Sequence, residues 1–108
     1  MKKLDANFNY LIDMYEDSYY PKVLVDKLKL HIVEVVDFIE ASEHTTEEIQ
    51  EQLDKMTIAI NDLQDEFYAN DSELETVARE SIAETVNAIL QHFNINIEIE
   101  EAIRERDW

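Results

Sequence analysis

The chain contains no glycine in 108 residues and only one proline, and this constrains its fold more than any other feature. Glycine enters positive φ angles without steric cost, and two-residue β-hairpin turns depend on it. A β-sheet is therefore disfavoured, and we predict an all-α fold. The phosphate-binding loop and the dinucleotide-binding fingerprint both require glycine, so these two nucleotide-binding motifs are excluded.

Hydrophobic spacing predicts three long helices, over residues 18–41, 45–69 and 72–93. The middle one carries the most regular apolar stripe, with steps of four and three residues: Ile49, Leu53, Met56, Ile60, Leu63 and Phe67. The lone Pro21 suits the first turn of the helix that begins near residues 18–21. That helix has a wide apolar arc, typical of a helix buried on several sides.

The boundaries of these helices have their own signals. Thr45 with Glu48 and Ser72 with Glu75 have the spacing of capping boxes, which predicts helix starts at both places. Asn94 suits a helix C-cap.

Two short helices are expected at the ends of the chain, over residues 6–16 and 97–106. Residues 95–99 alternate like a strand, but a lone strand has no partner for its backbone, so we prefer the helix. Long helices with short connections pack as antiparallel neighbours. We predict one domain, residues 1–108, folded as a small antiparallel helical bundle of three long helices plus short N- and C-terminal helices.

The net charge is −17, from 26 acidic and nine basic residues. Between Glu43 and Glu101 there are sixteen acidic residues and only two basic ones, Lys55 and Arg79. Such a field attracts basic proteins and repels nucleic acid and anionic membranes. We therefore expect a basic protein as partner, with no direct contact to nucleic acid or membrane. The candidate partner-binding residues are the acids that lie off the apolar stripes: Glu47, Glu51, Asp54, Asp62, Asp65, Glu66, Glu73, Glu80 and Glu84.

A second candidate region is an aromatic corner between the first two helices, where three of the five tyrosines lie close together in sequence. Tyrosine is favoured at interfaces, although it also closes the ends of bundles. Arg79, an isolated cation, is a candidate ion-pair partner for the acids of this corner. The members of the corner are Tyr15, Glu16, Asp17, Tyr19, Tyr20 and Arg79.

Catalytic and metal-binding signals are weak. No histidine follows an acidic residue by three positions, as a carboxylate metal site in a helical bundle requires. There is no cysteine, which excludes disulfides, thiolate metal sites and thiol nucleophiles. We expect no cofactor and no enzymatic activity. The lack of cysteine, of a signal peptide and of any apolar run long enough for a membrane helix favours a cytoplasmic protein.

Residues 10–27, YLIDMYEDSYYPKVLVDK, resemble the opening of a family of small acidic bacterial proteins of unknown function. Residues 75–80, ETVARE, and the closing RDW of residues 106–108 are similar to later motifs of that family. The resemblance covers nearly the whole chain and implies a compact bacterial cytosolic domain. It implies no activity, cofactor or catalytic residue.

Three functions remain open from the sequence. The first is a protein-binding module that neutralises or regulates a basic partner, as an immunity protein, an antitoxin or an inhibitor that mimics nucleic acid does. The second is a small enzyme or a metal- or ligand-binding protein with a cleft near Tyr15, Asp17 and Arg79. The third is a structural homodimer.

Overall fold

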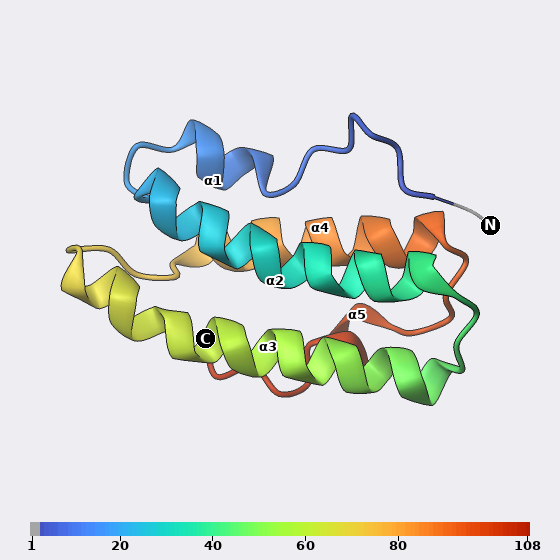
Figure 1. Cartoon of the computed structure of the whole chain (residues 1–108). Coiled ribbons are helices and arrows are strands. Elements are labelled where there is room, and N and C mark those ends of the chain that lie inside the picture. The colour runs from blue at the N-terminus through green and yellow to red at the C-terminus, as the bar shows by residue number, and fades with distance from the viewer. Residues whose placement is uncertain (1–2) are drawn as a thin grey trace.

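A computed structural model describes residues 3–108, and it confirms the all-α bundle. The helices are α1 (Ile12–Glu16), α2 (Lys22–Ala41), α3 (Thr46–Ala69), α4 (Thr76–His92) and α5 (Ile99–Ala102), with no strand among these residues. The chain reverses direction from α2 to α3 and again from α3 to α4, so consecutive long helices are antiparallel (Figure 1). Helix α1 lies against α2 and α4, and α5 lies against α3 and α4.

The predicted apolar stripe of α3 forms part of the core. All six of its residues, from Ile49 to Phe67, are buried. Thr45 accepts a hydrogen bond from the Glu48 N–H (3.2 Å), and the Glu48 carboxylate accepts one from the Thr45 N–H (2.8 Å). This capping box satisfies two N–H groups that the helix itself leaves free, so α3 begins where the sequence predicted.

Helix α2 ends at Ala41, as predicted, but it begins at Lys22, later than the predicted start at residues 18–21. Pro21 (φ −59°) precedes its first residue as the N-cap and does not lie in its first turn. The carbonyl of Pro21 accepts the N–H groups of Leu24 and Val25 (3.0 and 3.1 Å), which starts the helical ladder.

At the ends of α3 and α4, polar residues occupy the left-handed position that glycine usually takes. Asp71 (φ 56°) and Asn94 (φ 55°) adopt the left-handed conformation directly after the C-caps of α3 and α4. The N–H of Ser72 then bonds the Phe67 carbonyl (2.9 Å), and the N–H of Ile95 bonds the Leu90 carbonyl (2.9 Å). Both ends are Schellman motifs, in which asparagine and aspartate are tolerated substitutes for glycine. Asn94 therefore ends α4, as predicted, although as the residue after the cap.

Two further helix starts were predicted too early. The Asp5 carboxylate accepts the Asn7 N–H (2.8 Å) and holds a turn at that point. Leu11 has a left-handed backbone (φ 51°), which a right-handed helix does not contain, so α1 begins only at Ile12. Helix α4 begins at Thr76 rather than residue 72. The Ser72 hydroxyl donates to the Tyr19 carbonyl (3.1 Å), so the predicted capping box of Ser72 and Glu75 does not form.

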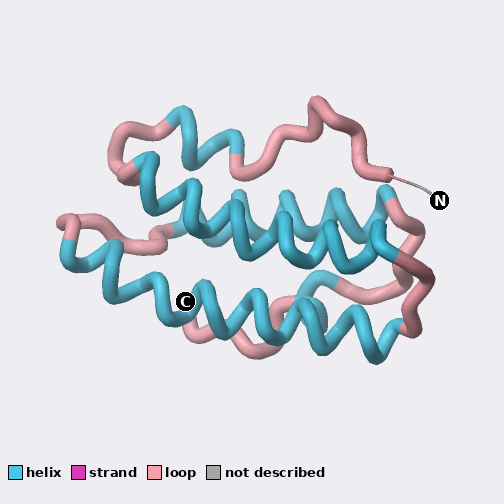
Figure 2. The backbone as a smooth tube through the Cα atoms, viewed as in Figure 1, coloured by secondary structure: helices cyan, strands magenta, loops and turns pink. Residues whose placement is uncertain are grey.

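The C-terminal helix is also shorter than predicted. Only Ile99–Ala102 of the expected 97–106 are helical, while residues 95–98 run as an extended loop (Figure 2). This loop and the tail after α5 lie alongside α3, and their attachment to that helix shapes the candidate site.

Candidate functional site

A polar stripe on α3 holds the C-terminal segment in place. Its residues have the same steps of four and three as the apolar stripe, shifted by one position: Gln50, Asp54, Thr57, Asn61 and Gln64. Gln50 and Thr57 are buried, and the others are half-buried. Sequence analysis missed this stripe as a unit and treated its Asp54 as a solvated acid. The repeated spacing beside the apolar stripe was the signal that could have found it.

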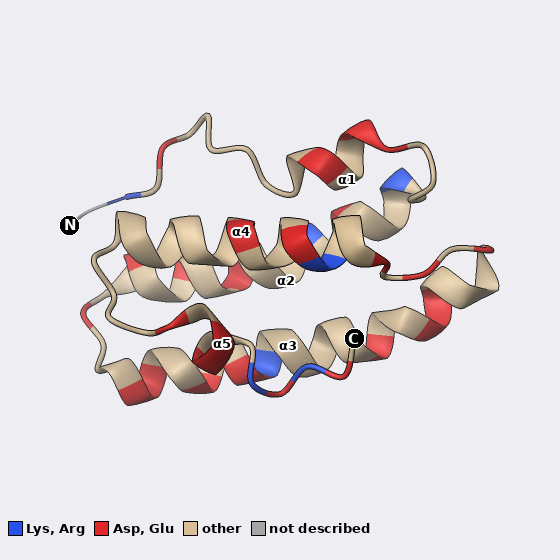
Figure 3. Cartoon of the chain, turned by 180° about the vertical axis from the view of Figure 1, so that it is seen from behind, with Lys and Arg blue, Asp and Glu red and all other residues tan. Residues whose placement is uncertain are grey.

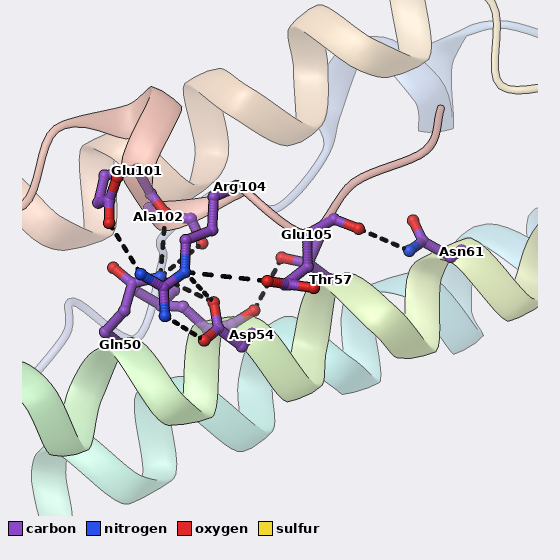
Figure 4. A network of polar contacts seen from close by, with 9 residues as sticks. Gln50, Asp54, Thr57, Asn61, Glu101, Ala102, Arg104 and Glu105 are labelled. Atoms are coloured by element: carbon purple, nitrogen blue, oxygen red, sulfur yellow. Dashed lines mark hydrogen bonds and ion pairs between the residues drawn. The ribbon is translucent and has the colours of Figure 1, made fainter.

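Gln50 fixes the end of α5. Its side chain is nine-tenths buried, and its Nε2 donates to the carbonyls of Glu101 (3.0 Å) and Ala102 (3.4 Å) and to Oδ1 of Asp54 (2.9 Å) (Figure 4). The last carbonyls of a helix have no partner within it. A single amide group therefore satisfies the end of α5 and joins it to α3.

Arg104 makes the second attachment. Its Nε and Nη2 donate to the two carboxylate oxygens of Asp54 (3.1 and 2.8 Å), and its Nη1 donates to Glu101 (2.9 Å). Burial raises the pKa of Asp54, but the hydrogen bonds from Arg104 and Gln50, together with the Arg104 charge, outweigh it and hold that pKa below its usual value. The same bonds raise the pKa of Arg104. The Asp54 carboxylate therefore serves to hold the C-terminal segment on α3.

The tail beyond Arg104 is fixed by two more amides. Asn61 donates to the Glu105 carbonyl (2.8 Å) and accepts the Asp107 N–H (3.1 Å), and Gln64 donates to the Asp107 carboxylate. Trp108 packs against the core with its Nε1 buried and without a hydrogen-bond partner among residues 3–108, so the final residue folds back onto the bundle.

This attachment leaves an open groove of about 710 Å³ between the start of α3 and the chain from Asn96 to Arg104. One wall is formed by Thr46, Glu47, Gln50 and Glu51, and the other by Asn96, Ile97, Glu98, Glu101 and Arg104. Asp and Glu occupy many positions on α3 and α5, with few Lys or Arg nearby (Figure 3).

The charge of the groove is unbalanced. Among residues 3–108, Glu47, Glu51 and Glu98 have no basic side chain within ion-pair distance. Within residues 3–108, Arg104 is the one cation of the lining, and it is already paired with Asp54 and Glu101. The groove therefore presents carboxylates to solvent without a neutralising cation of its own.

The nine acids predicted as one partner-binding surface do not lie together. Glu47 and Glu51 line the groove, whereas Glu84 lines a hollow beside α1, and Glu73 lines a third hollow beside Arg79 and Trp108. Glu66 is paired with Lys27 (2.6 Å). The remaining predicted acids are exposed outside these hollows: Asp62, Asp65 and Glu80.

The aromatic corner joins elements of the bundle. The Tyr15 hydroxyl donates to Asp26 of α2 (2.6 Å), and burial together with this bond and the Asp26 charge raises the pKa of Tyr15. The Asp17 carboxylate accepts the Tyr19 N–H (2.9 Å). Tyr20 is buried edge-on to Phe67 of α3, with ring centroids 6.5 Å apart. The polar atoms of Tyr15 and Asp17 thus serve contacts within the fold, while Glu16 is exposed.

Arg79 does not join this corner. Its Nη2 donates to Thr76 (3.3 Å), and in the part of the chain that the structure describes it forms no ion pair with Glu16, Asp17 or Glu75. The structure therefore does not support the predicted pair between Arg79 and the acids of the corner.

Residues 3–108 contain neither a metal-binding cluster nor a membrane-spanning helix. No group of three or more histidine, aspartate or glutamate side chains is placed to hold a metal ion. None of the helices combines the length and the apolar character that crossing a membrane requires.

Comparison with known proteins gives one match. The sequence model of a family described as "Family of unknown function (DUF5713)" matches residues 4–108. No curated protein and no solved structure matches the chain.

Proposed function

We propose that this chain, which belongs to a family of unknown function, is a protein-binding module that neutralises or regulates a basic partner. The observation that carries the proposal is the open groove beside α3, in which Glu47, Glu51 and Glu98 face solvent without an ion-pair partner among residues 3–108. Immunity proteins, antitoxins and inhibitors that mimic nucleic acid act in this way.

Electrostatics supports a cationic occupant. Like charges gathered in one place repel each other and destabilise the fold, and a basic partner relieves that repulsion on binding. A net charge of −17 also steers basic partners toward the molecule and speeds association at low salt. An anionic partner gains neither advantage, which is why nucleic acid and anionic membranes are not proposed.

The size and construction of the groove support the same role. The groove has a volume of about 710 Å³ and is open to solvent, so side chains of a partner protein have room to enter it. Its walls are held by Gln50 and Arg104, whose hydrogen bonds fix α5 and the chain beside it against α3. A wall held in advance loses less conformational entropy when a partner binds.

We propose no catalytic role and a cytoplasmic location. Tyr15 and Asp17 are two of the three residues of the alternative cleft. The Tyr15 hydroxyl donates to Asp26, and the Asp17 carboxylate accepts the Tyr19 N–H, so these polar atoms already have partners within the fold. A chain without cysteine suits a reducing compartment, because small secreted domains commonly rely on disulfides.

The test compares two charge-reversed variants that have the same net charge. Glu47→Lys/Glu51→Lys alters the groove, and Asp62→Lys/Asp65→Lys alters exposed positions of the same helix outside it. Each tagged protein is incubated with lysate of the source organism and washed at low and high salt, and the bound proteins are identified by mass spectrometry. Circular dichroism checks that both variants are folded.

We expect the wild type and the Asp62/Asp65 variant to retain the same basic protein at low salt and to release it at high salt. The Glu47/Glu51 variant should not retain it. Equal retention by all three proteins, or equal loss from both variants, would contradict the assignment to the groove.

A further inference from the structure

A second hollow lies at the end of the bundle where α2 ends and α3 begins. It has a volume of about 460 Å³, and four large apolar side chains line it: Ile39 of α2, Ile49 of α3, and Phe93 and Ile95, which follow α4. Ser42, Glu43 and His44 of the connection between α2 and α3 complete the lining. An apolar hollow at the surface is suited to take an apolar side chain from another molecule.

The walls of this hollow are fixed by contacts within the fold. The His44 ring stacks on Phe38 with centroids 3.7 Å apart, and its Nε2 lies 3.1 Å from the Ser42 hydroxyl. On the other side, the left-handed Asn94 and the bond from the Ile95 N–H to Leu90 set the direction of the chain. The hollow therefore exists before any partner binds.

The apolar hollow and the acidic groove share a boundary. Ile49 lines the hollow and the next residue, Gln50, lines the groove. On the facing side Ile95 lines the hollow, and Asn96 and Ile97 line the groove. The two spaces are therefore neighbours, because the first turns of α3 and the loop that follows α4 contribute to the lining of both.

We infer that the hollow and the groove form one site, which takes a cationic segment of a partner protein that carries a large apolar residue beside its Lys or Arg residues. The apolar residue enters between Ile39, Ile49, Phe93 and Ile95, while the cations face the carboxylates of Glu47, Glu51 and Glu98. This inference rests on the proposed function and adds what the partner must present.

Charge complementarity decides among possible occupants. Glu43 at the edge of the hollow and the three unpaired carboxylates of the groove repel an anionic ligand, such as a fatty acid. They leave the cations of a basic segment favourably placed. For a segment with both features, apolar burial and charge attraction both contribute to the binding free energy. For a purely basic or purely apolar segment, only one of the two contributes.

The test uses three synthetic peptides with blocked ends: KKLKK, KKSKK and EELEE. Binding to the whole protein is followed by 15N–1H NMR titration at low salt, which gives both affinity and location. We expect KKLKK to bind about tenfold more tightly than KKSKK, because burying a leucine side chain contributes that much or more. Peak shifts should occur at residues of both spaces, and EELEE should not bind.

A variant that fills the hollow separates its contribution from that of the groove. Ser42 is exposed, and its extended backbone (φ −167°) accepts any side chain, so Ser42→Tyr should occupy the hollow without disturbing the core. The variant removes the contact between the Ser42 hydroxyl and His44, whose ring still stacks on Phe38. This variant should lose the preference for KKLKK and keep the affinity for KKSKK. Ser18→Tyr, at an exposed site in the connection between α1 and α2, is the control and should bind both peptides as the wild type does.

The outcomes distinguish the two proposals. If KKLKK and KKSKK bind equally in the groove and Ser42→Tyr changes neither, the combined site is wrong while the acidic groove stands. If neither cationic peptide shifts residues of the groove, or if EELEE binds as well as they do, the proposed function fails and the combined site fails with it.

Discussion

Replacing Gln50 with glutamate tests whether one buried amide holds the C-terminal segment on α3. The substitution keeps the shape of the side chain but exchanges its NH₂ donor for a carboxylate oxygen. That oxygen would face the carbonyls of Glu101 and Ala102 and the Asp54 carboxylate, at positions where Nε2 now lies 3.0, 3.4 and 2.9 Å away. The site is nine-tenths buried, so water cannot replace the lost donor.

The cost follows from comparing two states of the new carboxyl. Ionised, it loses the donor bonds, at about 1–3 kcal/mol, and repels Asp54, with about 4 kcal/mol at 4 Å and an effective dielectric of about 20. Protonated, it can donate one bond again, and holding the proton at pH 7, about 2.7 units above a free glutamate pKa, costs about 4 kcal/mol. The protonated state of the new carboxyl therefore has the lower free energy in the folded protein.

We expect Gln50→Glu to lower the free energy of unfolding by about 4 kcal/mol at pH 7, which is a large part of the total for a domain of this size. The folded-state pKa of the new carboxyl is raised, so its cost is absent below the unfolded pKa and grows as pH rises. The deficit should shrink to under about 1 kcal/mol near pH 4.5. Urea denaturation, monitored by circular dichroism at several pH values, measures the loss of stability at pH 7 and its change with pH.

Gln52→Glu is the matched control, because it adds the same charge two residues away at a half-buried position beside Lys55. It should change the free energy of unfolding by less than about 0.5 kcal/mol. Equal deficits in the two variants, or a Gln50→Glu deficit that does not change with pH, would refute the role assigned to the amide.

Three further predictions concern the helix ends, the ion pair and the net charge. Asn94→Ala should lower the free energy of unfolding by about 1–2 kcal/mol, because alanine is strained at φ 55°. Asn94→Gly should not lower it, because glycine adopts this angle freely. If urea titrations gave the same loss of stability for both variants, backbone strain at residue 94 would not be the cause. The pKa of Asp54 is lowered in the fold, so its stabilisation is complete above about pH 3.9 and lost as pH falls through the folded value. The stability difference between wild type and Asp54→Asn should therefore narrow below pH 4, and a constant difference from pH 5 to 2.5 would contradict this. Raising NaCl from about 0.01 to 0.5 M should raise Tm in calorimetry, because it screens the repulsion of a net charge of −17, and a falling Tm would oppose the interpretation.

The parts of the fold that follow from local spacing were predictable. The apolar stripe of α3 and the capping box of Thr45 and Glu48 depend on residues within one helix, and both form as predicted. The same local rule failed at Ser72, because its N–H completes the end of α3 and its hydroxyl bonds Tyr19 across the bundle. A capping signal predicts a helix start only where no tertiary contact takes the same side chain.

The candidate site was only half predictable for a similar reason. Glu47 and Glu51 were expected as solvated acids, and they line the groove. Its opposite wall, from Asn96 to Arg104, depends on how the C-terminal segment packs against α3, and no periodicity within that segment indicates this. The pairing of Asp54 with Arg104 spans fifty residues of sequence, so sequence spacing placed Asp54 among the free acids.

The ion pairs of the C-terminal segment involve acids near α5 and leave Glu47, Glu51 and Glu98 of the groove unpaired among residues 3–108. Arg104 and Arg106 pair with three acids: Asp54 of α3, and Glu100 and Glu101 of α5. The basic residues of the C-terminal segment therefore neutralise the carboxylates that the fold itself brings together. Those facing the groove receive no such partner within residues 3–108, and their mutual repulsion remains as a cost to stability. The proposed cationic partner would remove that cost on binding, so a surface that weakens the free protein would strengthen the complex.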